Sequence, residues 1–194
     1  MQSKETEFKN ILNIDQFNAI AHKFSFAAPF KQTNVYFDTN DGALHQQHMG
    51  MRIRIFNDYA EQTIKTPSPQ HIDHQLIETT DKLTLQQALT LVNTGKIYSN
   101  GAVAKILEQH HIKITDLKII AQATTTRRLV QLPAGLLTLD QTIYPNNKSD
   151  YELEMEFDPN NYTLSSNFFH NLLKDFHIVP TTTPNKIARA IANK

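Results

Sequence analysis

Three glutamates in the segment 151–157 alternate strictly with apolar residues: Glu152, Glu154 and Glu156. Such alternation is typical of a β-strand, because successive side chains leave opposite faces of the backbone. All three carboxylates would then lie on one face, each roughly 6.6–6.8 Å from the next. Like charges this close repel one another. The pattern therefore indicates either an acidic face turned to water or a row of ligands for a cation.

The same spacing of charged residues recurs in segments that are distant along the chain. Glu5, Glu7 and Lys9 occupy alternate positions near the N-terminus. Arg52 and Arg54 alternate with apolar residues in the segment 51–55. As strands, both segments would carry their ionised groups on one face.

Strands of this kind allow two architectures, and periodicity does not choose between them. In the first, the charged faces point to water and the sheet packs its apolar side on helices. In the second, the charged faces point toward one another, so that the sheet closes into a barrel with a charged lumen. The apolar outside of that barrel would then be covered by helices.

The acidic residues are candidate ligands for a metal ion. Hard divalent cations such as Mg²⁺ bind carboxylate oxygens and commonly keep waters and substrate phosphates as their remaining ligands. If the first and last charged strands lie side by side, their acids could share one ion; otherwise they are separate solvated faces. The acidic set is Glu5, Glu7, Glu152, Glu154 and Glu156.

The basic residues are candidate ligands for phosphate. Arginine binds phosphate through two parallel hydrogen bonds and lysine acts as a point charge. Arg127 and Arg128 are adjacent, so only one of them can face a given side of a strand. The basic set is Lys9, Arg52, Arg54, Lys65 and one of these two arginines.

Composition excludes several classes of function. The formal net charge is zero, so no overall field favours nucleic acid or an anionic membrane as a partner. There is no cysteine, which excludes disulfides, thiolate metal sites and a cysteine nucleophile. Glycine-rich phosphate loops and the G-x-S-x-G motif are absent. Because no apolar run approaches the ~20 residues that cross a bilayer, and the N-terminus lacks signal-peptide character, we expect a cytoplasmic protein.

The periodicity of apolar residues predicts about eight strands, most of them hairpin-connected and therefore antiparallel. The predicted strands span residues 4–12, 34–39, 50–56, 60–66, 72–80, 117–131, 136–144 and 150–158.

Helices are predicted between and after the strands, which makes the chain a single α+β domain over residues 1–194. Capping-box patterns at Asn13 and Thr84 mark two helix starts, and Pro184 would take the first position of the last helix. The predicted helices span residues 14–24, 84–95, 100–110, 165–177 and a C-terminal segment that opens at 183–184.

Six motifs that occur in a fixed order carry a resemblance to a known family. They are Glu5-x-Glu7-x-Lys9, Tyr36-Phe37-Asp38-Thr39, Met51-Arg52-Ile53-Arg54, Thr63-Ile64-Lys65, the acidic segment from Leu139-Asp140 to Glu152-x-Glu154-x-Glu156, and Asn185-Lys186-Ile187-Ala188-Arg189. Together they resemble the CYTH domain, or triphosphate tunnel metalloenzyme superfamily. One departure is Asn185, where the family usually has serine.

The resemblance implies an eight-stranded antiparallel barrel, or tunnel, with a charged lumen and helices packed on its outside. It implies metal binding, by Mg²⁺ or Mn²⁺, at Glu5, Glu7, Glu154 and Glu156. It implies triphosphate binding at Lys9, Arg52, Arg54, Lys65, Arg127 and Lys186. The catalytic group that it implies is Glu5, Glu7, Lys9 and Glu156.

The resemblance favours divalent-metal-dependent hydrolysis of a triphosphate, either tripolyphosphate or a small organic triphosphate, with a small molecule or inorganic polyphosphate as partner. Two alternatives stay open. A non-catalytic module that binds polyphosphate or a nucleotide would use the same bases. A class IV type adenylate cyclase would share the fold, although the His-Phe pair that tends to precede the first motif in that branch is missing.

Overall fold

The computed structural model describes residues 2–68 and 75–194, apart from the side chains of residues 4, 5 and 75. Within this part of the chain lie eight strands: β1 Gln2–Leu12, β2 Phe30–Thr39, β3 Gly50–Ile55, β4 Tyr59–Pro67, β5 Gln75–Thr84, β6 Leu117–Leu132, β7 Gly135–Ile143 and β8 Ser149–Glu156. The predicted strand 72–80 is therefore seen from residue 75 onward, and residues 72–74 lie outside the description.

The helices of the described chain are α1 Ile14–Lys23, α2 Ala43–Gln46, α3 Leu85–Asn93, α4 Ala102–Gln109, α5 Tyr162–Asp175 and α6 Lys186–Ala192. Short 3-10 helices cover Ile114–Asp116 and Pro159–Asn161.

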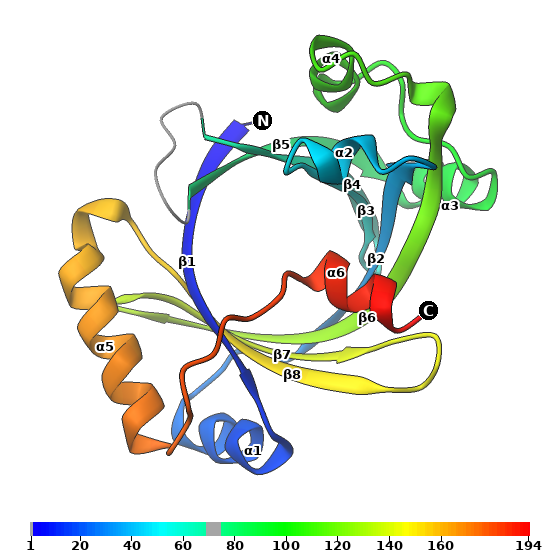
Figure 1. The fold of residues 1–194 in the computed structure, drawn as a ribbon. Helices are drawn as coiled ribbons and strands as arrows, with labels where there is room; N and C mark the ends of the chain where they lie inside the picture. Colours follow the sequence, from blue (N-terminus) through cyan, green and yellow to red (C-terminus); the bar gives the residue numbers. More distant parts are fainter. Residues whose placement is uncertain (1, 69–74) are drawn as a thin grey trace.

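The strands form a closed antiparallel barrel in the order β1-β5-β4-β3-β2-β6-β7-β8, which confirms the second of the two architectures. Figure 1 shows the barrel viewed down its axis, with α1, α3, α4 and α5 outside the ring of strands. Closure depends on β1, which pairs with β5 over Gln2–Thr6 and with β8 over Glu7–Leu12. The first strand of the chain thereby joins the last one.

Most of the apolar core lies between the barrel wall and the outer helices, and a smaller cluster packs Ala190 of α6 against Tyr36 on the lumen side. One cluster packs the outward residues of β2, β3 and β4, such as Phe37 and Ile53, against α3 and α4. A second packs those of β7 and β8, such as Met155, against α1 and α5. The apolar half of each alternating strand is thus used for outer packing, and the charged half is left for the lumen.

Both predicted capping boxes are present. The side chain of Asn13 accepts a hydrogen bond from the backbone N–H of Gln16, and Thr84 does the same for Gln87. The reciprocal hydrogen bonds from the cap backbones to the Gln side chains are also formed, at 3.0 and 2.9 Å.

The predicted start of the last helix is wrong. The helix begins at Lys186 and not at Pro184, and Asn185 is its N-cap. The side-chain oxygen of Asn185 accepts a hydrogen bond from the backbone N–H of Ala188 at 2.9 Å. An Asn cap satisfies an N–H that would otherwise have no partner, and this preference outweighs that of proline for the first turn.

No helix in the described ranges combines the length and the apolar character that crossing a bilayer requires.

Candidate active site in the barrel lumen

The pairing of β1 with β8 brings the N-terminal and C-terminal charged rows together. Glu7 lies opposite Glu156 in the register, and Lys9 lies opposite Glu154. The backbone of Glu5 continues the same row toward β5, where it lies opposite Leu76, while its side chain is outside the description.

One cavity of about 1110 Å³ fills the lumen. Every predicted site residue whose side chain is described lines it, whether predicted for catalysis, metal or substrate: Glu7, Lys9, Arg52, Arg54, Lys65, Arg127, Glu154, Glu156 and Lys186. The volume is slightly above the range of about 300–1,000 Å³ that is usual for small-molecule sites.

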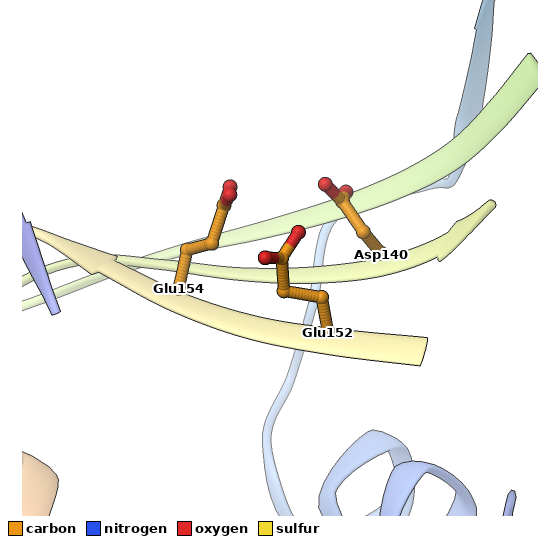
Figure 2. A group of neighbouring side chains, drawn as sticks. All are labelled: Asp140, Glu152 and Glu154. Atoms are coloured by element: carbon orange, nitrogen blue, oxygen red, sulfur yellow. The ribbon is translucent and has the colours of Figure 1, made fainter. Parts of the chain in front are cut away.

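The wall formed by β7 and β8 carries three carboxylates that point toward one another (Figure 2). Each of Asp140, Glu152 and Glu154 offers an oxygen, and these oxygens lie within 4.8 Å of one another. Asp140 and Glu152 are buried completely or almost so. Oxygen donors at this spacing could hold a metal ion.

Three cations already bind these carboxylates. Arg127 donates two hydrogen bonds to Asp140, at 2.9 and 2.6 Å, and one to Glu154 at 2.9 Å. Lys186, the first residue of α6, contacts all three carboxylates. Arg189 supplies a third base, which Glu152 shares with Asp150.

Arg189 completes this network from the second turn of α6. Its guanidinium donates to both oxygens of Glu152, at 3.1 and 2.9 Å, and to Asp150 at 2.8 Å. α6 projects onto the opening of the strand ring in Figure 1, and these contacts hold it there. A metal ion bound by this cluster would have to displace Lys186.

The pKa shifts show that the network favours its ionised state. Burial alone would lower the pKa of Lys186, but Glu154 and Asp140 outweigh burial and raise it well above its ordinary value. Burial alone would raise the pKa of Glu154, but Lys186 and Arg127 hold it well below its usual range. Each charged group is stabilised by oppositely charged neighbours within the cluster. We call a cluster paired in this way a closed network.

The wall formed by β2 and β3 is positive. Arg52 donates to Glu78 at 3.1 Å, and Arg54 donates to Asn34 at 2.9 Å. Burial, together with the charges of Arg52 and Arg127, lowers the pKa of Arg54 to about 9. A buried cation that its surroundings destabilise in this way would be stabilised by a bound anion.

Three buried donors on the same wall have no hydrogen-bond partner within the described chain: Nε of Arg52, the hydroxyl of Tyr36 and Nε2 of Gln32. Tyr36 is 4% exposed and lies directly opposite Arg52 in the strand register. Burial raises the pKa of this hydroxyl despite the nearby arginines, so it stays protonated and can donate. Orphaned buried donors are costly, and a phosphate oxygen would satisfy them.

The β1–β8 pair supplies the second acidic position. Glu7 and Glu156 face each other across the two strands, a like-charge arrangement that favours a bound cation. Lys9 donates to Glu7 at 2.9 Å. Burial would lower the pKa of Lys9, but Glu7 outweighs it and the pKa is raised. Carboxylate oxygens at this position are the ligands that a hard divalent ion prefers.

The ambiguity between the two adjacent arginines is resolved by the structure. Arg127 faces the lumen, whereas the guanidinium of Arg128 lies 5.2 Å from the ring centre of Phe17 on α1, outside the barrel. Lys65 also lines the cavity, at the end of β4.

Sequence reasoning undervalued three residues. Asp140 and Arg189 were predicted only as members of motifs and were given no role in the site, yet they anchor the closed network. Tyr36 entered only as part of a motif. Its alternation with the outward residues Val35 and Phe37 is the signal that could have placed it in the lumen.

A closed antiparallel barrel with a basic wall and acidic rows inside it could hold an anion and a metal ion side by side in its tunnel. The chain belongs to the CYTH family, because the CYTH domain model matches residues 3–191.

Similar proteins agree with this assignment. A protein of Bacillus subtilis (strain 168), provisionally named triphosphatase YjbK, is 32% identical over 195 residues, covering 100% of this chain and 97% of the relative. A crystal structure from Bacillus halodurans, provisionally named an adenylate cyclase, is 29% identical with a TM-score of 0.87 and covers 97% of both chains. HpAC1 from Hippeastrum shares the fold at 17% identity and a TM-score of 0.79, covering 100% of this chain and 97% of that one.

Proposed function

We propose that this protein is a triphosphatase that depends on a divalent metal ion and cleaves a phosphoanhydride bond inside the barrel. The observation that carries the proposal is a set of three orphaned donors on the β2–β3 wall, inside a cavity that acidic residues also line: Arg52 Nε, the Tyr36 hydroxyl and Gln32 Nε2. The relative that is 32% identical and is provisionally named a triphosphatase supports it.

The basic wall would bind the phosphate chain. Arg52 and Arg54 would donate to phosphate oxygens, and Tyr36 would add a neutral donor beside them. Binding an anion would offset the burial and the repulsion that lower the pKa of Arg54. Lys65 and Lys9 extend the positive lining of the same cavity and would bind the two ends of the phosphate chain.

The acidic residues of β1 and β8 would hold Mg²⁺ or Mn²⁺. We assign Glu7 and Glu156, with Glu5 beside them along β1, as its ligands. Glu154 would act as a helper, since Arg127 and Lys186 already bind it. When bound, such an ion neutralises phosphate charge and lowers the pKa of a bound water.

The remaining chemistry is positioning and electrostatic stabilisation, so no serine or cysteine nucleophile is required. Lys9, which Glu7 orients, would donate to the developing charge on the leaving oxygen. The closed network of Asp140, Glu152 and Glu154 with its three bases would keep the barrel wall rigid behind the substrate.

Release of phosphate from a panel of triphosphates tests the proposal. The purified protein is incubated with Mg²⁺ or Mn²⁺ and either tripolyphosphate or a nucleoside triphosphate. We expect metal-dependent release that the variant Glu7→Gln/Glu156→Gln lacks. Release by the unaltered protein no faster than by this variant, for every substrate, would reject the proposal.

A second candidate function is binding without turnover. It is favoured by the salt-bridge network, in which Asp140, Glu152 and Glu154 need no metal for charge balance. Calorimetric titration with tripolyphosphate in the absence of metal tests it. Binding that survives Glu156→Gln but not Arg52→Ala/Arg54→Ala, without any turnover, would support this candidate.

The provisional name of the Bacillus halodurans relative raises cyclase activity as a third candidate. Incubation with ATP separates it from the first. Cyclic AMP as the product would assign a cyclase, whereas a diphosphate and orthophosphate would assign a triphosphatase.

A further inference from the structure

Three lumen-facing rows end in an aromatic residue at the same mouth of the barrel. On β3 the row of Arg52 and Arg54 continues to Phe56 just after the strand. On β4 Tyr59 precedes Glu61 in the lumen-facing row, and on β2 Phe30 is the first residue. Because side chains alternate along a strand, all three rings continue the charged rows and do not belong to the outer core.

The three rings contact one another at that mouth. Phe56 and Tyr59 close the β3–β4 hairpin through a backbone hydrogen bond of 2.9 Å. Their ring centroids are 4.4 Å apart with an interplanar angle of 16°, and the ring of Phe30 lies 6.3 Å from that of Phe56. All three line the lumen cavity.

This aromatic mouth is incompletely buried. Tyr59 is 47% exposed. Asn57 and Asp58, at the hairpin tip, line the same part of the cavity and offer hydrogen-bonding groups beside the rings. An exposed ring with polar groups around it suits a ligand that is flat, aromatic and polar at its edge.

The aromatic mouth adjoins the phosphate-binding wall. Phe56 is two residues beyond Arg54, so the two side chains start roughly 6.6–6.8 Å apart along the strand direction. Inorganic tripolyphosphate has no group that gains from an apolar, aromatic surface, and it would occupy only part of a cavity of about 1110 Å³. A ligand that carries a ring at one end and a phosphate chain at the other would use both regions.

We propose that Phe30, Phe56 and Tyr59 form a subsite for the aromatic ring of an organic triphosphate, which stacks on Tyr59 while its phosphates lie along Arg52 and Arg54. This inference rests on the proposed function and narrows it to substrates such as nucleoside triphosphates. Stacking tolerates different bases, because every base has a π-face. The subsite therefore selects for a ring and not for one particular base.

The test compares two substrates on the same variant. Removing the aromatic side chain abolishes its stacking with the ligand's ring. The affinity for that ligand should then fall by about 5- to 150-fold. For Tyr59→Ala we therefore expect kcat/KM to fall by that range with ATP and to change less than about twofold with tripolyphosphate. Tyr59→Phe, which keeps the ring, should behave like the unaltered protein with both substrates.

Tyr162→Ala is the matched control. Tyr162 is similarly exposed, at 56%, and contacts two phenylalanine rings, but it lies on α5 outside the lumen. It should leave both substrates unaffected. Phe30→Leu keeps apolar volume without a ring and gives a second measurement should Tyr59→Ala unfold.

Calorimetric titration without metal reports the same preference independently of turnover. Tighter binding of ATP than of tripolyphosphate, lost in Tyr59→Ala or in Phe30→Leu, supports the subsite even if neither ligand is hydrolysed. Equal losses for the two ligands, or no loss for ATP, would overturn the subsite. Absence of hydrolysis of both substrates, with this binding preference intact, would reject the proposed function alone.

Discussion

Both walls of the tunnel carry ion pairs, but they differ in how completely their charged groups are paired. On the β7–β8 wall, Asp140, Glu152 and Glu154 are matched by three bases, and the pKa of Glu154 is held low. On the β2–β3 wall, Arg52 keeps an orphaned donor and burial lowers the pKa of Arg54. A closed network holds structure together, whereas an incomplete one indicates where a ligand supplies the missing charge.

The largest expected effect follows from removing a base of the incomplete wall. Arg54→Ala should lower kcat/KM for a triphosphate by about 10²–10³-fold, the usual result of removing one preorganised donor to a developing charge. Its thermal midpoint should fall only slightly, because the loss of the contacts with Asn34 and Glu61 is offset by removal of a charge that burial destabilises. Steady-state kinetics and a melting curve check both parts. A large loss of stability with little loss of activity would assign Arg54 to the structural network.

The opposite pattern is expected on the closed wall. Arg189→Met should cost about 3 kcal/mol of unfolding free energy, the lower end for breaking a buried ion pair, since Lys186 still contacts Glu152. Urea denaturation measures it. A variant as stable as the unaltered protein would mean that α6 is not held by this network.

A smaller effect is expected for the orphaned hydroxyl on the incomplete wall. Tyr36→Phe should lower kcat/KM about tenfold, because one hydrogen bond to a charged phosphate oxygen is lost. The unfolding free energy should stay level or rise, since a buried hydroxyl without a partner is removed. Kinetics and urea denaturation of the variant are compared with those of the parent. Unchanged kinetics would exclude Tyr36 from phosphate binding.

The smallest expected effect concerns acid pH. The pKa of Glu154 is lower in the folded protein than its ordinary value of 4.5, so its ion pairs contribute stability above pH 4.5 that is lost as the pH falls through the folded pKa. Glu154→Gln should therefore be less stable at neutral pH, and its deficit should shrink below pH 4.5. Urea denaturation at several pH values gives the two curves. If the unfolding free energies of the variant and the unaltered protein differ by the same amount at every pH, ion pairs are not the cause of the lowered pKa of Glu154.

The faces of individual strands could be read from the sequence, but the partners of the charged residues could not. Alternation places Arg52 and Arg54 on one face of β3, and the structure confirms that this face lines the lumen. Nothing in that alternation shows that Asp140 binds Arg127, or that Arg189 reaches Glu152 from the C-terminal helix. Such pairings depend on register and tilt between strands, which are properties of the assembled sheet.

What the sequence by itself determined was local: the strand faces, the two capping boxes and the order of the CYTH motifs. These depend on neighbours within a few residues, where backbone geometry sets which side chains share a face. Only the tertiary structure decided that β1 pairs with β8, that Arg127 and not Arg128 faces inward, and that Lys186 enters the acidic cluster. The physical reason is that barrel closure and long-range ion pairs depend on packing between distant segments, which no local pattern specifies.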